Sequence, residues 1–452
     1  MDLIDAQKAT RIKLFDWKSV QMRSFHLTWV SFFLCFFGWF GIAPLMAVVR
    51  EDLDLSKSEI SWTIIASVAI TIVVRLVVGP LCDRIGPRKT YAGLMILGAF
   101  PVMGIGLANS FESFLLFRLA IGGIGASFVI TQYHTSVMFA PNVVGTATAT
   151  TAGWGNLGGG VTLMVMPLIF AAIVMLGAEE TLGWRLAMVA PGMVLLVAGA
   201  AYYQFTEDCP AGNYRDLRRS GAMAELNKSG SAWGTFRSAA ADPRVWFMFL
   251  IYGACFGTDL TILNIGAIYF FDSFDLDLKT AGLIAGLFGL MSIFARTLGG
   301  VFSDKIAART GLGGRVHFLF IVTFLGGVAL IVFSQMRVLG LAIAAVLVFS
   351  LFVKMAQGAT FSIVPFMNRH ALGAISGIVG AGGNAGAVAA GFLFKSETLS
   401  YADGLLYLGI AATLCSVLAL FVRFSPDIIA HERQRLAEAL ALRAAPAPVA
   451  AE

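Results

Sequence analysis

Long apolar runs separated by short polar loops recur along the whole chain. A membrane-spanning helix needs about 20 mainly apolar residues to cross about 30 Å of hydrocarbon. Runs of at least that length occur at approximately 26–49, 60–80, 90–109, 114–139, 145–176, 184–205, 245–271, 281–301, 316–335, 338–366, 372–394 and 403–424. The pattern therefore predicts an all-α integral membrane protein with twelve transmembrane helices.

One polar connection is longer than the others and separates the sixth apolar run from the seventh. It covers about residues 207–244 and mixes basic and acidic side chains, as a hydrated linker does. It divides the chain into an N-terminal six-helix half at 25–206 and a C-terminal six-helix half at 245–424. A polar segment at 1–24 precedes the first half, and a tail at 425–452 follows the second. We expect the Ala- and Pro-rich end of that tail to be disordered.

Lys and Arg are unevenly shared between the two sets of loops. The N-terminal segment, the loop between the second and third runs, the linker and the loop between the eighth and ninth runs are basic, whereas the opposite loops hold acidic clusters. The basic loops of membrane proteins face the cytoplasm. We therefore expect a multi-pass protein of the cytoplasmic membrane with both termini in the cytoplasm.

Composition argues against several other classes of protein. Hydrophobic residues make up 58% of the chain and charged residues 13%, against about 25% charged in soluble domains. The net charge of +5 is too small to indicate nucleic-acid binding. Five scattered cysteines indicate neither a disulfide framework nor a metal site, and the chain has no common hydrolase motif. We expect membrane lipid around the protein, no cofactor or metal, no nucleic-acid partner and no enzymatic activity.

The second and eighth apolar runs end in the same motif. Both fit R-x-x-x-G-x-x-x-D-[RK]-I, from Arg75 to Ile85 and from Arg296 to Ile306, at an offset of 221 residues. The second and eighth spans are equivalent positions in two six-span halves, which indicates an internal duplication. This plan resembles the major facilitator fold, in which parallel repeats place the substrate near the membrane midplane between the halves.

A glycine-rich repeat on the fifth and eleventh runs supports the duplication. The segments that begin at Gly145 and Gly373 align at an offset of 228, with Asn156 opposite Asn384. Small residues let membrane helices approach closely, so we expect smooth surfaces on which the halves rock, formed by Gly153, Gly155, Gly158, Gly159, Gly380, Gly382, Gly383 and Gly386. The asparagines are harder to explain as packing, because an unpaired amide inside a membrane needs a partner.

The stretch from Gly79 to Lys89 (GPLCDRIGPRK) resembles the loop signature of the major facilitator superfamily. Gly79 and its counterpart Gly300 would let helices touch. The charged residues that follow them, Asp83, Arg84 and Asp304, would form a lock between the halves that breaks during rocking. Alternatively, these charges anchor the cytoplasmic loops, and the pattern favours neither role over the other.

Arg75 and Arg296 each lie eight residues before the aspartate of their motif, which is about 12 Å along a helix. An arginine near the bilayer centre costs about 2.5–3.5 kcal/mol, and two at one depth repel each other. We therefore predict that an anion binds between them. Snorkelling or pairing with a carbonyl is the alternative, which the depth and the symmetry disfavour. The planar guanidinium donates paired hydrogen bonds to flat oxyanions.

Three segments carry a more specific resemblance. Ala152 to Pro167 (AGWGNLGGGVTLMVMP) and Gly373 to Gly386 (GAISGIVGAGGNAG) resemble the two glycine-rich signatures of the nitrate/nitrite porter family. Arg23 to Phe33 (RSFHLTWVSFF) is similar to the plant and fungal high-affinity nitrate transporters and their bacterial relatives. The resemblance covers about residues 23–425. It implies secondary active transport of nitrate, or of nitrite, by alternating access, and we expect a monomer.

The resemblance also implies which residues bind the anion. In that family two arginines surround nitrate, aromatic rings from the fourth and seventh spans flank its plane, and asparagine lies nearby. The matching residues of this chain are Arg75, Arg296, Phe128, Asn156, Tyr252, Phe256 and Asn384. Without the resemblance, Phe128 would be interpreted as ordinary core packing.

Nitrate carries no proton at physiological pH, so a symporter needs a titratable residue of its own. Tyr252, Phe256 and Asp259 have the i, i+4, i+7 spacing of one helical face, and the plant-type relatives resemble this chain in having an acid there. We predict that Asp259 binds the coupling proton in proton-coupled nitrate uptake. The alternatives are nitrate/nitrite antiport, and a structural role for Asp259 as the partner of a neighbouring Arg or Lys.

Three further ionisable residues lie inside apolar runs. Arg118 begins R-x-x-x-G-x-x-G, which resembles a facilitator motif linked to proton coupling, although an ion pair between packed helices would explain it equally well. We expect His134 to be interfacial. Lys354 either pairs with a carboxylate or adds positive field to the cavity.

Two other functions deserve comparison with nitrate transport. A small-carboxylate carrier would keep the fold and the arginines without both asparagine–glycine signatures. A non-transporting membrane sensor would bring a signalling domain, and the polar segments of this chain are too short for one.

Overall fold

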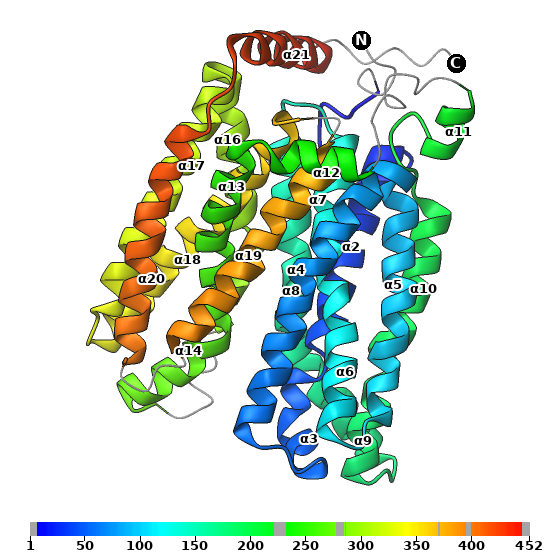
Figure 1. Ribbon diagram of the computed structural model, residues 1–452, viewed down its shortest axis with the longest axis vertical. Coiled ribbons are helices and arrows are strands. Elements are labelled where there is room, and N and C mark those ends of the chain that lie inside the picture. The colour runs from blue at the N-terminus through cyan, green and yellow to red at the C-terminus, as the bar shows by residue number, and fades with distance from the viewer. Residues whose placement is uncertain are drawn as a thin grey trace.

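The computed structural model describes residues 7–220, 232–276, 284, 286–368, 371–394 and 399–444. Twelve helical stretches within these residues are long and apolar enough to cross a membrane. They run roughly side by side through the length of the molecule (Figure 1). The prediction of an all-α membrane protein with twelve spans is confirmed.

The first six spans, called the N half here, pack against one another. Their helices are α2 (Val20–Phe40), α4 (Lys57–Ile85), α5 (Pro87–Gly104), α6 (Phe111–Gly122) continued by η3 (Gly123–Ala126) and α7 (Ser127–Met138), α8 (Val144–Met175), and α9 (Glu180–Ala187) continued by α10 (Val189–Phe205). Two short helical segments, η1 (Ala43–Leu45) with α3 (Met46–Asp52), follow α2, and η2 (Ile105–Leu107) ends the third span. Within this half α2 packs on α8, and α5 on α10.

The last six spans form the C half. Their helices are α13 (Pro243–Tyr252) continued by η5 (Gly253–Gly257) and α14 (Thr258–Phe274), η6 (Met291–Ile293) with α16 (Ala295–Thr310), α17 (Leu312–Ser334), α18 (Leu339–Phe361) with η7 (Val364–Phe366), α19 (Leu372–Phe394), and α20 (Tyr401–Ser416) with η9 (Val417–Phe421). Within this half α17 packs on α18 and α20, and α13 on α19.

Local sequence explains where several helices begin. Ser56 and Glu59 form a capping box at the start of α4, and Ser400 and Asp403 form another at the start of α20. Each box satisfies two backbone N–H groups that a helix start leaves unpaired. Asp242 caps α13, where Pro243 occupies the first helical position and has no N–H to satisfy.

Glycine makes two equivalent sharp turns possible. Gly86, between α4 and α5, has φ +91°, and Gly311, between α16 and α17, has φ +71°. Residues with a Cβ rarely adopt such angles. The turns separate spans two and three in the N half and spans eight and nine in the C half, so the duplication includes the loop geometry.

Two spans extend further than hydropathy predicts. The apolar runs end at about residues 80 and 301, whereas α4 continues through the repeated motif to Ile85 and α16 to Thr310. The added turns carry Asp83, Arg84 and Asp304, whose charges end an apolar run without ending a helix. These extended ends place both aspartates next to the opposite half.

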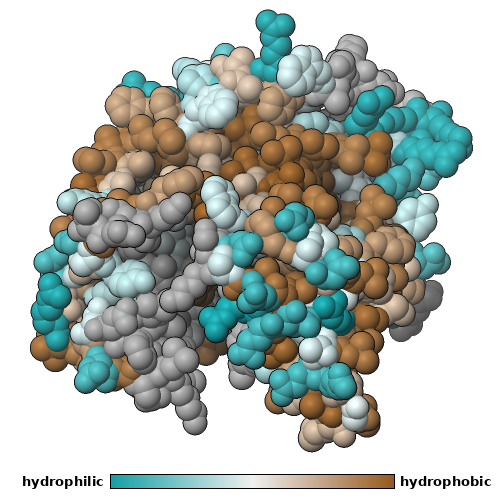
Figure 2. Space-filling view, turned by 60° about the horizontal axis from the view of Figure 1, so that its bottom comes forward, coloured by the Kyte–Doolittle hydropathy of each residue, from teal (hydrophilic) through white to brown (hydrophobic). Residues whose placement is uncertain are grey.

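The outer surface is apolar, as lipid contact requires. Leu97, Leu116, Val197 and Leu414 are among the large apolar side chains that are more than half exposed. Figure 2 shows hydrophobic side chains over much of the visible surface and hydrophilic ones in separate groups at the lower centre, the left edge and the upper right of the view. Such a surface is stable against lipid tails but not against water.

The two ends of the bundle are named here by their short helices. The terminal face carries α11 (Tyr214–Arg219), α12 (Ala232–Ala240) and α21 (Pro426–Ala444), and the distal face carries α3 and α9 (Figure 1). Both α11 and α12 belong to the predicted linker, and α12 contacts α4 and α19, one from each half. Residues 1–6, 221–231 and 445–452 of the predicted N-terminal segment, linker and tail lie outside the described residues.

The halves meet along two pairs of helices. Span two packs on span eleven (α4 on α19), and span five on span eight (α8 on α16). Gly79 faces the backbone of Gly373, and Gly300 faces the backbone of Gly145, so closely that a Cβ at either position would collide with it. The duplicated motif therefore provides close contacts between the halves on both sides of the pseudo-two-fold axis.

Candidate anion-binding site

Arg75 of α4 and Arg296 of α16 lie in the middle of the molecule and are buried. Their exposed fractions are 0% and 1%. Among the described residues, neither guanidinium forms an ion pair with a carboxylate. Two positive charges are therefore buried in the same region without a fixed counter-ion, an arrangement that favours a mobile anion as the missing partner.

Arg75 is held by backbone carbonyl oxygens. Its Nη1 donates to the carbonyl of Gly380 in α19, and its Nη2 donates to the carbonyl of Gly125 at 3.2 Å. Gly380 belongs to the C half, so this arginine contacts both halves. Its Nε is buried and has no hydrogen-bond partner in the described part of the chain.

Arg296 is held by side chains of its own half. Its Nη1 donates to Oε1 of Gln357 at 3.0 Å, and its Nη2 donates to the hydroxyl of Tyr252 at 3.2 Å. The Nε of Arg296 is also buried without a partner in the described residues. Each arginine thus keeps an N–H group that can donate a hydrogen bond to a bound oxyanion.

The ring of Phe128 joins the two arginines. The guanidinium carbon of Arg75 is 5.3 Å from its centroid and that of Arg296 is 5.1 Å away. The negative face of an aromatic ring stabilises a cation at this range. A single ring from the N half therefore helps to hold both positive charges close together.

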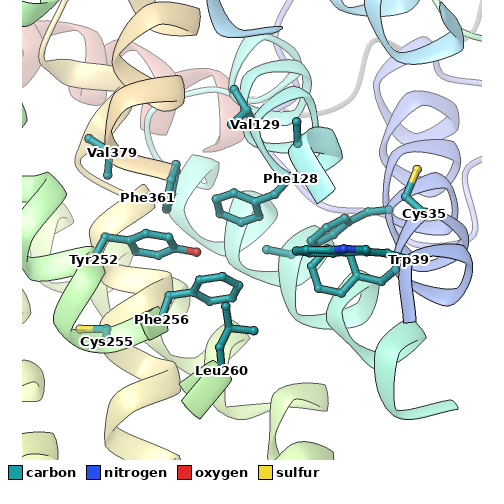
Figure 3. Close-up of a cluster of buried hydrophobic side chains, with 14 of the residues drawn as sticks. Cys35, Trp39, Phe128, Val129, Tyr252, Cys255, Phe256, Leu260, Phe361 and Val379 are labelled. Carbon is teal, nitrogen blue, oxygen red and sulfur yellow. The ribbon is translucent and has the colours of Figure 1, made fainter. Parts of the chain in front are cut away.

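Three aromatic rings in the site are nearly parallel. Phe128 stacks with Tyr252 (5.7 Å, 13°) and with Phe256 (6.2 Å, 13°), and Tyr252 stacks with Phe256 (5.3 Å, 7°). Figure 3 shows Phe128 approaching from one half and the other two rings from the opposite half, with the Tyr252 hydroxyl directed toward Phe128. Parallel rings on opposite halves suit a flat ligand between them.

The backbone of span seven changes form at these rings. Residues Gly253–Gly257 form a π-helix, η5, between α13 and α14. Such π-helical turns are rare and frequently lie at functional sites. This one carries Phe256 and lies between Tyr252 and Asp259, so it sets the direction of all three predicted side chains.

Phe361, the last residue of α18, also contributes to the site, although it was not predicted. Its ring meets Phe128 edge-on (4.8 Å, 89°) and Tyr252 likewise (5.0 Å, 80°). It packs across the rings from both halves. No spacing or motif marked this residue, because an aromatic in an apolar span normally indicates core packing.

The two predicted asparagines differ in their surroundings. Asn384 is fully buried and its Nδ2 donates to the carbonyl of Val68 in α4 at 3.2 Å, which joins α19 to the N half. Asn156 is partly buried. The Oδ1 atoms of both have no hydrogen-bond partner in the described residues. No hydrogen bond among these residues joins either amide to Arg75 or Arg296.

Asp259 lies in a buried polar cluster beside the arginines. Its Oδ1 accepts from Nζ of Lys354 at 2.8 Å, and its Oδ2 accepts from Nε2 of Gln357 at 2.9 Å. Gln357 also contacts Arg296, so the carboxylate is connected to the arginine through one side chain. Of the two roles expected for Lys354, pairing with a carboxylate is the one found, and the partner is Asp259.

Sequence reasoning missed Gln357, although a signal was present. Gln132 precedes it by 225 residues, between the offsets of 221 and 228 that relate the other repeated segments. The two glutamines lie on spans four and ten, which are equivalent. Gln132 donates instead to the carbonyl of Thr148 at 3.2 Å, so the repeat identifies the position but not its contacts.

Arg118 and His134 lie apart from the rings. Arg118 is buried and donates to the carbonyl of Trp39 at 3.3 Å, and it has no carboxylate partner in the described residues. His134 is fully buried, with Nδ1 beside the Tyr202 hydroxyl (2.5 Å) and Nε2 beside the carbonyl of Glu207 (2.7 Å). Its ring is enclosed near the ends of α7 and α10, and the expectation that His134 is interfacial stays a prediction.

The predicted glycines divide into two groups. One group lies between the halves, where Gly153 faces the backbone of Ser292 and Gly380 faces Phe128. The other group packs inside one half: Gly155, Gly158 and Gly159 face Phe32, Phe33 and Phe40 of span one, and Gly382, Gly383 and Gly386 face span seven at Phe249, Tyr252 and Gly253. Gly383 meets the ring edges of Tyr252 and Phe256, so it supports the site rather than the sliding surface.

The two motif aspartates bind helix starts of the opposite half. Asp83 accepts from the backbone N–H groups of Gly373 and Ala374 (3.1 and 3.2 Å) at the start of α19. Asp304 accepts from those of Gly145 and Thr146 (3.1 and 2.6 Å) at the start of α8. A carboxylate is favoured at the positive end of a helix.

The cations near these aspartates are used differently. Arg315 forms an ion pair with Asp304 at 2.7 Å and also donates to the carbonyl of Pro141 in the N half at 2.9 Å. The Arg84 side chain is exposed, and its carbonyl accepts from Arg218 of α11 at 2.5 Å. Asp304 and Arg315 both belong to the C half, so their ion pair lies within that half, and each of them contacts the N half through backbone groups.

The described residues hold no group of three His, Cys, Asp or Glu side chains that could bind a metal ion. What they do hold is a pair of buried cations, flat rings and two unsatisfied guanidinium N–H groups. Chemically, this arrangement can bind a small planar anion at the interface of the two halves.

Comparisons with known proteins agree with this fold. The Major Facilitator Superfamily model matches residues 28–391. Among solved structures, the proton:xylose symporter superposes with a TM-score of 0.67 over 89% of this chain and 96% of its own, and the E. coli fucose:proton symporter with 0.64 over 89% and 100%. Both are 13% identical to this chain, so this similarity supports the fold alone.

Relatives of known name are much closer in sequence. High affinity nitrate transporter 2.5 of Arabidopsis thaliana is 41% identical over 92% of this chain and 82% of its own length. Nitrate transporter 2.1 of Chlamydomonas reinhardtii is 38% identical over 91% and 76%, and a nitrate/nitrite transporter of Nostoc punctiforme is 27% identical over 92% and 94%. The chain belongs to the Major Facilitator Superfamily and, within it, to the family of the high-affinity nitrate transporters.

Proposed function

We propose that this protein transports nitrate across the cytoplasmic membrane by alternating access, as a monomer, and that it couples uptake to protons. The observation that carries the proposal is the burial of Arg75 and Arg296, from opposite halves, over the ring of Phe128 and with no carboxylate partner among the described residues. The relatives named above are nitrate transporters. Nitrite, which is also a flat anion, is a second substrate of the same site.

The proposed binding geometry follows from the chemistry of the arginines. Nitrate is planar and has three oxygens, and a guanidinium donates pairs of hydrogen bonds in its own plane. With one arginine from each half, the bound anion neutralises the repulsion between them. Phe128 on one side and Tyr252 with Phe256 on the other would cover its two faces.

Alternating access follows from where the halves are joined. Asp83 and Asp304 hold the starts of α19 and α8 on the terminal face, and α12 spans α4 and α19 there. We assign this face to the cytoplasm, because it carries the basic loops. These contacts close the cytoplasmic side, and they must break when the halves rock to release the anion inward.

The proposed coupling residue is Asp259. Nitrate stays unprotonated in the cell, and both arginines are charged at every cellular pH, so neither can carry the proton. Asp259 is a carboxylate buried one side chain away from Arg296. Its ion pair with Lys354 also fits the alternative of a purely structural aspartate, and that alternative would leave nitrate/nitrite exchange as the mode of transport.

A vesicle experiment separates the modes. Purified protein is reconstituted into liposomes that are empty or loaded with nitrite, and external nitrate is added with or without an inward proton gradient. We expect uptake into empty vesicles that follows the gradient and is lost in Asp259→Asn, while nitrate counterflow in that variant remains. Uptake that requires internal nitrite would mean exchange, and no nitrate flux under any condition would refute the proposal.

The arginines supply a second test. We expect Arg75→Lys and Arg296→Lys each to weaken nitrate binding by about 2–5 kcal/mol, because lysine cannot reproduce the paired hydrogen bonds of a buried charge. Binding is measured by calorimetry on purified protein. Arg309→Lys, an exposed change on the terminal face, is the control and should bind as the unmodified protein does. Equal affinity in all three variants would contradict the site.

A further inference from the structure

Gln357 occupies a single position between the proposed anion site and the proposed proton site. Its side chain is fully buried. Oε1 accepts from Nη1 of Arg296 at 3.0 Å, and Nε2 donates to Oδ2 of Asp259 at 2.9 Å. No other side chain among the described residues bonds to both groups, so Gln357 is the shortest connection between them.

The two ends of an amide are not equivalent, and this fixes the orientation of Gln357. A guanidinium only donates hydrogen bonds and an ionised carboxylate only accepts them. The amide must therefore turn its oxygen to Arg296 and its NH₂ group to Asp259, as observed. The same orientation is incompatible with a proton on Oδ2 of Asp259, because an O–H group would then face an NH₂ group that cannot accept.

We propose that Gln357 is a positioning residue that couples nitrate binding to protonation of Asp259 by rotation of its amide. The inference rests on the proposed proton-coupled function. When an anion binds Arg296 and a proton from the solvent binds Oδ2 of Asp259, the amide turns by half a rotation about its terminal bond. Its oxygen then accepts from the new Asp259 O–H, and its NH₂ group donates to the bound anion.

The reverse rotation accompanies release. Once nitrate leaves on the cytoplasmic side, the amide NH₂ faces the donors of Arg296 and has no acceptor there. Turning back restores the Arg296 contact and presents the NH₂ group to Asp259, which favours loss of the proton to the same side. The anion and the proton therefore each strengthen the binding of the other, as reciprocal coupling requires.

The remaining charged and titratable groups around Asp259 come from four elements. Lys354 of α18 bonds directly to Oδ1, Arg296 of α16 is reached through Gln357, and Tyr252 of α13 and Cys255 of η5 lie near enough to interact electrostatically. Lys354 holds one carboxylate oxygen while Gln357 holds the other. The proton is therefore assigned to the oxygen that faces Gln357.

The N half offers a matched control. Gln132 is the equivalent glutamine of span four, is equally buried and donates to the carbonyl of Thr148. It contacts neither an arginine nor a carboxylate among the described residues. Gln132→Met and Gln357→Met remove the same amide from equivalent helices and keep the side-chain length, but only the second breaks the connection.

The test counts protons taken up with nitrate. Nitrate is titrated into purified protein by calorimetry, from pH 5.5 to pH 8 or so, in buffers of different ionisation enthalpy. We expect the unmodified protein and Gln132→Met to take up a proton on binding, with an affinity that falls up to about tenfold per pH unit. Gln357→Met should bind nitrate with an affinity that no longer depends on pH.

A second variant keeps the test valid if Gln357→Met fails to fold. Gln357→Asn keeps an amide but is one methylene shorter, so it cannot reach Arg296 and Asp259 at once. It should lose the proton uptake as Gln357→Met does. Proton uptake retained in either folded variant, while Asp259→Asn abolishes it, would overturn this inference alone. Nitrate binding without proton uptake in the unmodified protein would overturn the proton-coupled function and this inference with it.

Discussion

Arg75 in the N half and Arg296 in the C half occupy equivalent positions in the repeat, but their guanidinium groups are held by different kinds of partner. Arg75 bonds to backbone carbonyls, one of them in the opposite half. Arg296 bonds to the side chains of Gln357 and Tyr252 in its own half. A backbone carbonyl offers the same acceptor in every protonation state, whereas a side-chain amide can turn.

The difference extends to the charges behind each arginine. Behind Arg296 lie Gln357, Asp259 and Lys354, joined by hydrogen bonds. At the 225-residue offset of the glutamines, Lys354 corresponds to Val129, and in the described part of the chain Gln132 hydrogen-bonds only to a backbone carbonyl. Duplication thus produced two equal cations for binding, and among the described residues only the C half joins its cation by hydrogen bonds to a carboxylate and an ammonium group. We infer that the N half positions the anion while the C half senses the proton.

The strongest test of this contrast removes the cation of the ion pair. Lys354→Met leaves the buried carboxylate of Asp259 without a positive partner, and breaking one side of a buried pair costs about 3–5 kcal/mol. Asp259→Asn/Lys354→Met removes both charges, so we expect most of that stability to return. Unfolding of the purified protein in detergent, followed by circular dichroism, gives the comparison.

The double variant also identifies the origin of the loss. The Lys354 ammonium lies 4.6 Å from the centroid of the Phe288 ring, so part of the loss could come from packing. If the double variant is as unstable as Lys354→Met, the ring contact and not the ion pair holds this region together, and the contrast between the halves loses its electrostatic basis.

The sequence was sufficient for the features that are contiguous in the chain. Twelve apolar runs predicted the spans, and a repeated motif identified Arg75 and Arg296, because one short segment carries each signal. The pairing of Asp259 with Lys354 was not predictable, since 95 residues separate them and hydropathy does not say which faces of spans seven and ten meet. Gln357 was missed for a related reason: a neutral amide in an apolar run has no signature of its own.

The glycines show the same limit. Their spacing indicated smooth helix surfaces, and close backbone contacts are found at Gly79, Gly153 and Gly300. The spacing could not say which partner each surface has. Gly155 and Gly158 pack on span one inside the N half, because a small residue permits close approach without specifying what approaches.

The contacts that close the terminal face give a second test, with a smaller effect. Asp304 is 6% exposed, is paired with Arg315 and accepts from Thr146, whereas Asp83 accepts from two backbone N–H groups and is less buried. Asp304→Asn should destabilise the closed face by about 1.5–3 kcal/mol, the value of hydrogen bonds to charged groups. Asp83→Asn should cost about 0.3–1 kcal/mol, the value of a charge at a helix start.

Distances across the terminal face measure this difference. Spin labels at the exposed positions 84 and 309, one in each half, should report a larger open population in Asp304→Asn than in Asp83→Asn. The labelled protein that keeps both aspartates provides the reference distribution of label-to-label distances. An equal or larger opening in Asp83→Asn would show that the halves are held symmetrically at this face, contrary to the difference in their contacts.

The smallest effect concerns the linker, whose Asp208 carboxylate docks it on the N half at Arg88. Asp208 accepts from the backbone N–H groups of Arg88 and Tyr214 at 3.0 Å each, and burial raises the pKa of its carboxyl above the ordinary value, although these hydrogen bonds and Arg88 oppose the shift. A raised pKa means that the docked linker binds a proton more readily than the free one. Docking is therefore favoured at low pH and weakens as the pH rises through the raised pKa.

A spin label at the exposed position 215 of α11 should become more mobile over that range, and Asp208→Asn should abolish the change. A label at position 434 of α21, which is attached to the C half, should not respond; if both labels respond alike, the pH dependence belongs to the whole terminal face and not to the anchor of the N half.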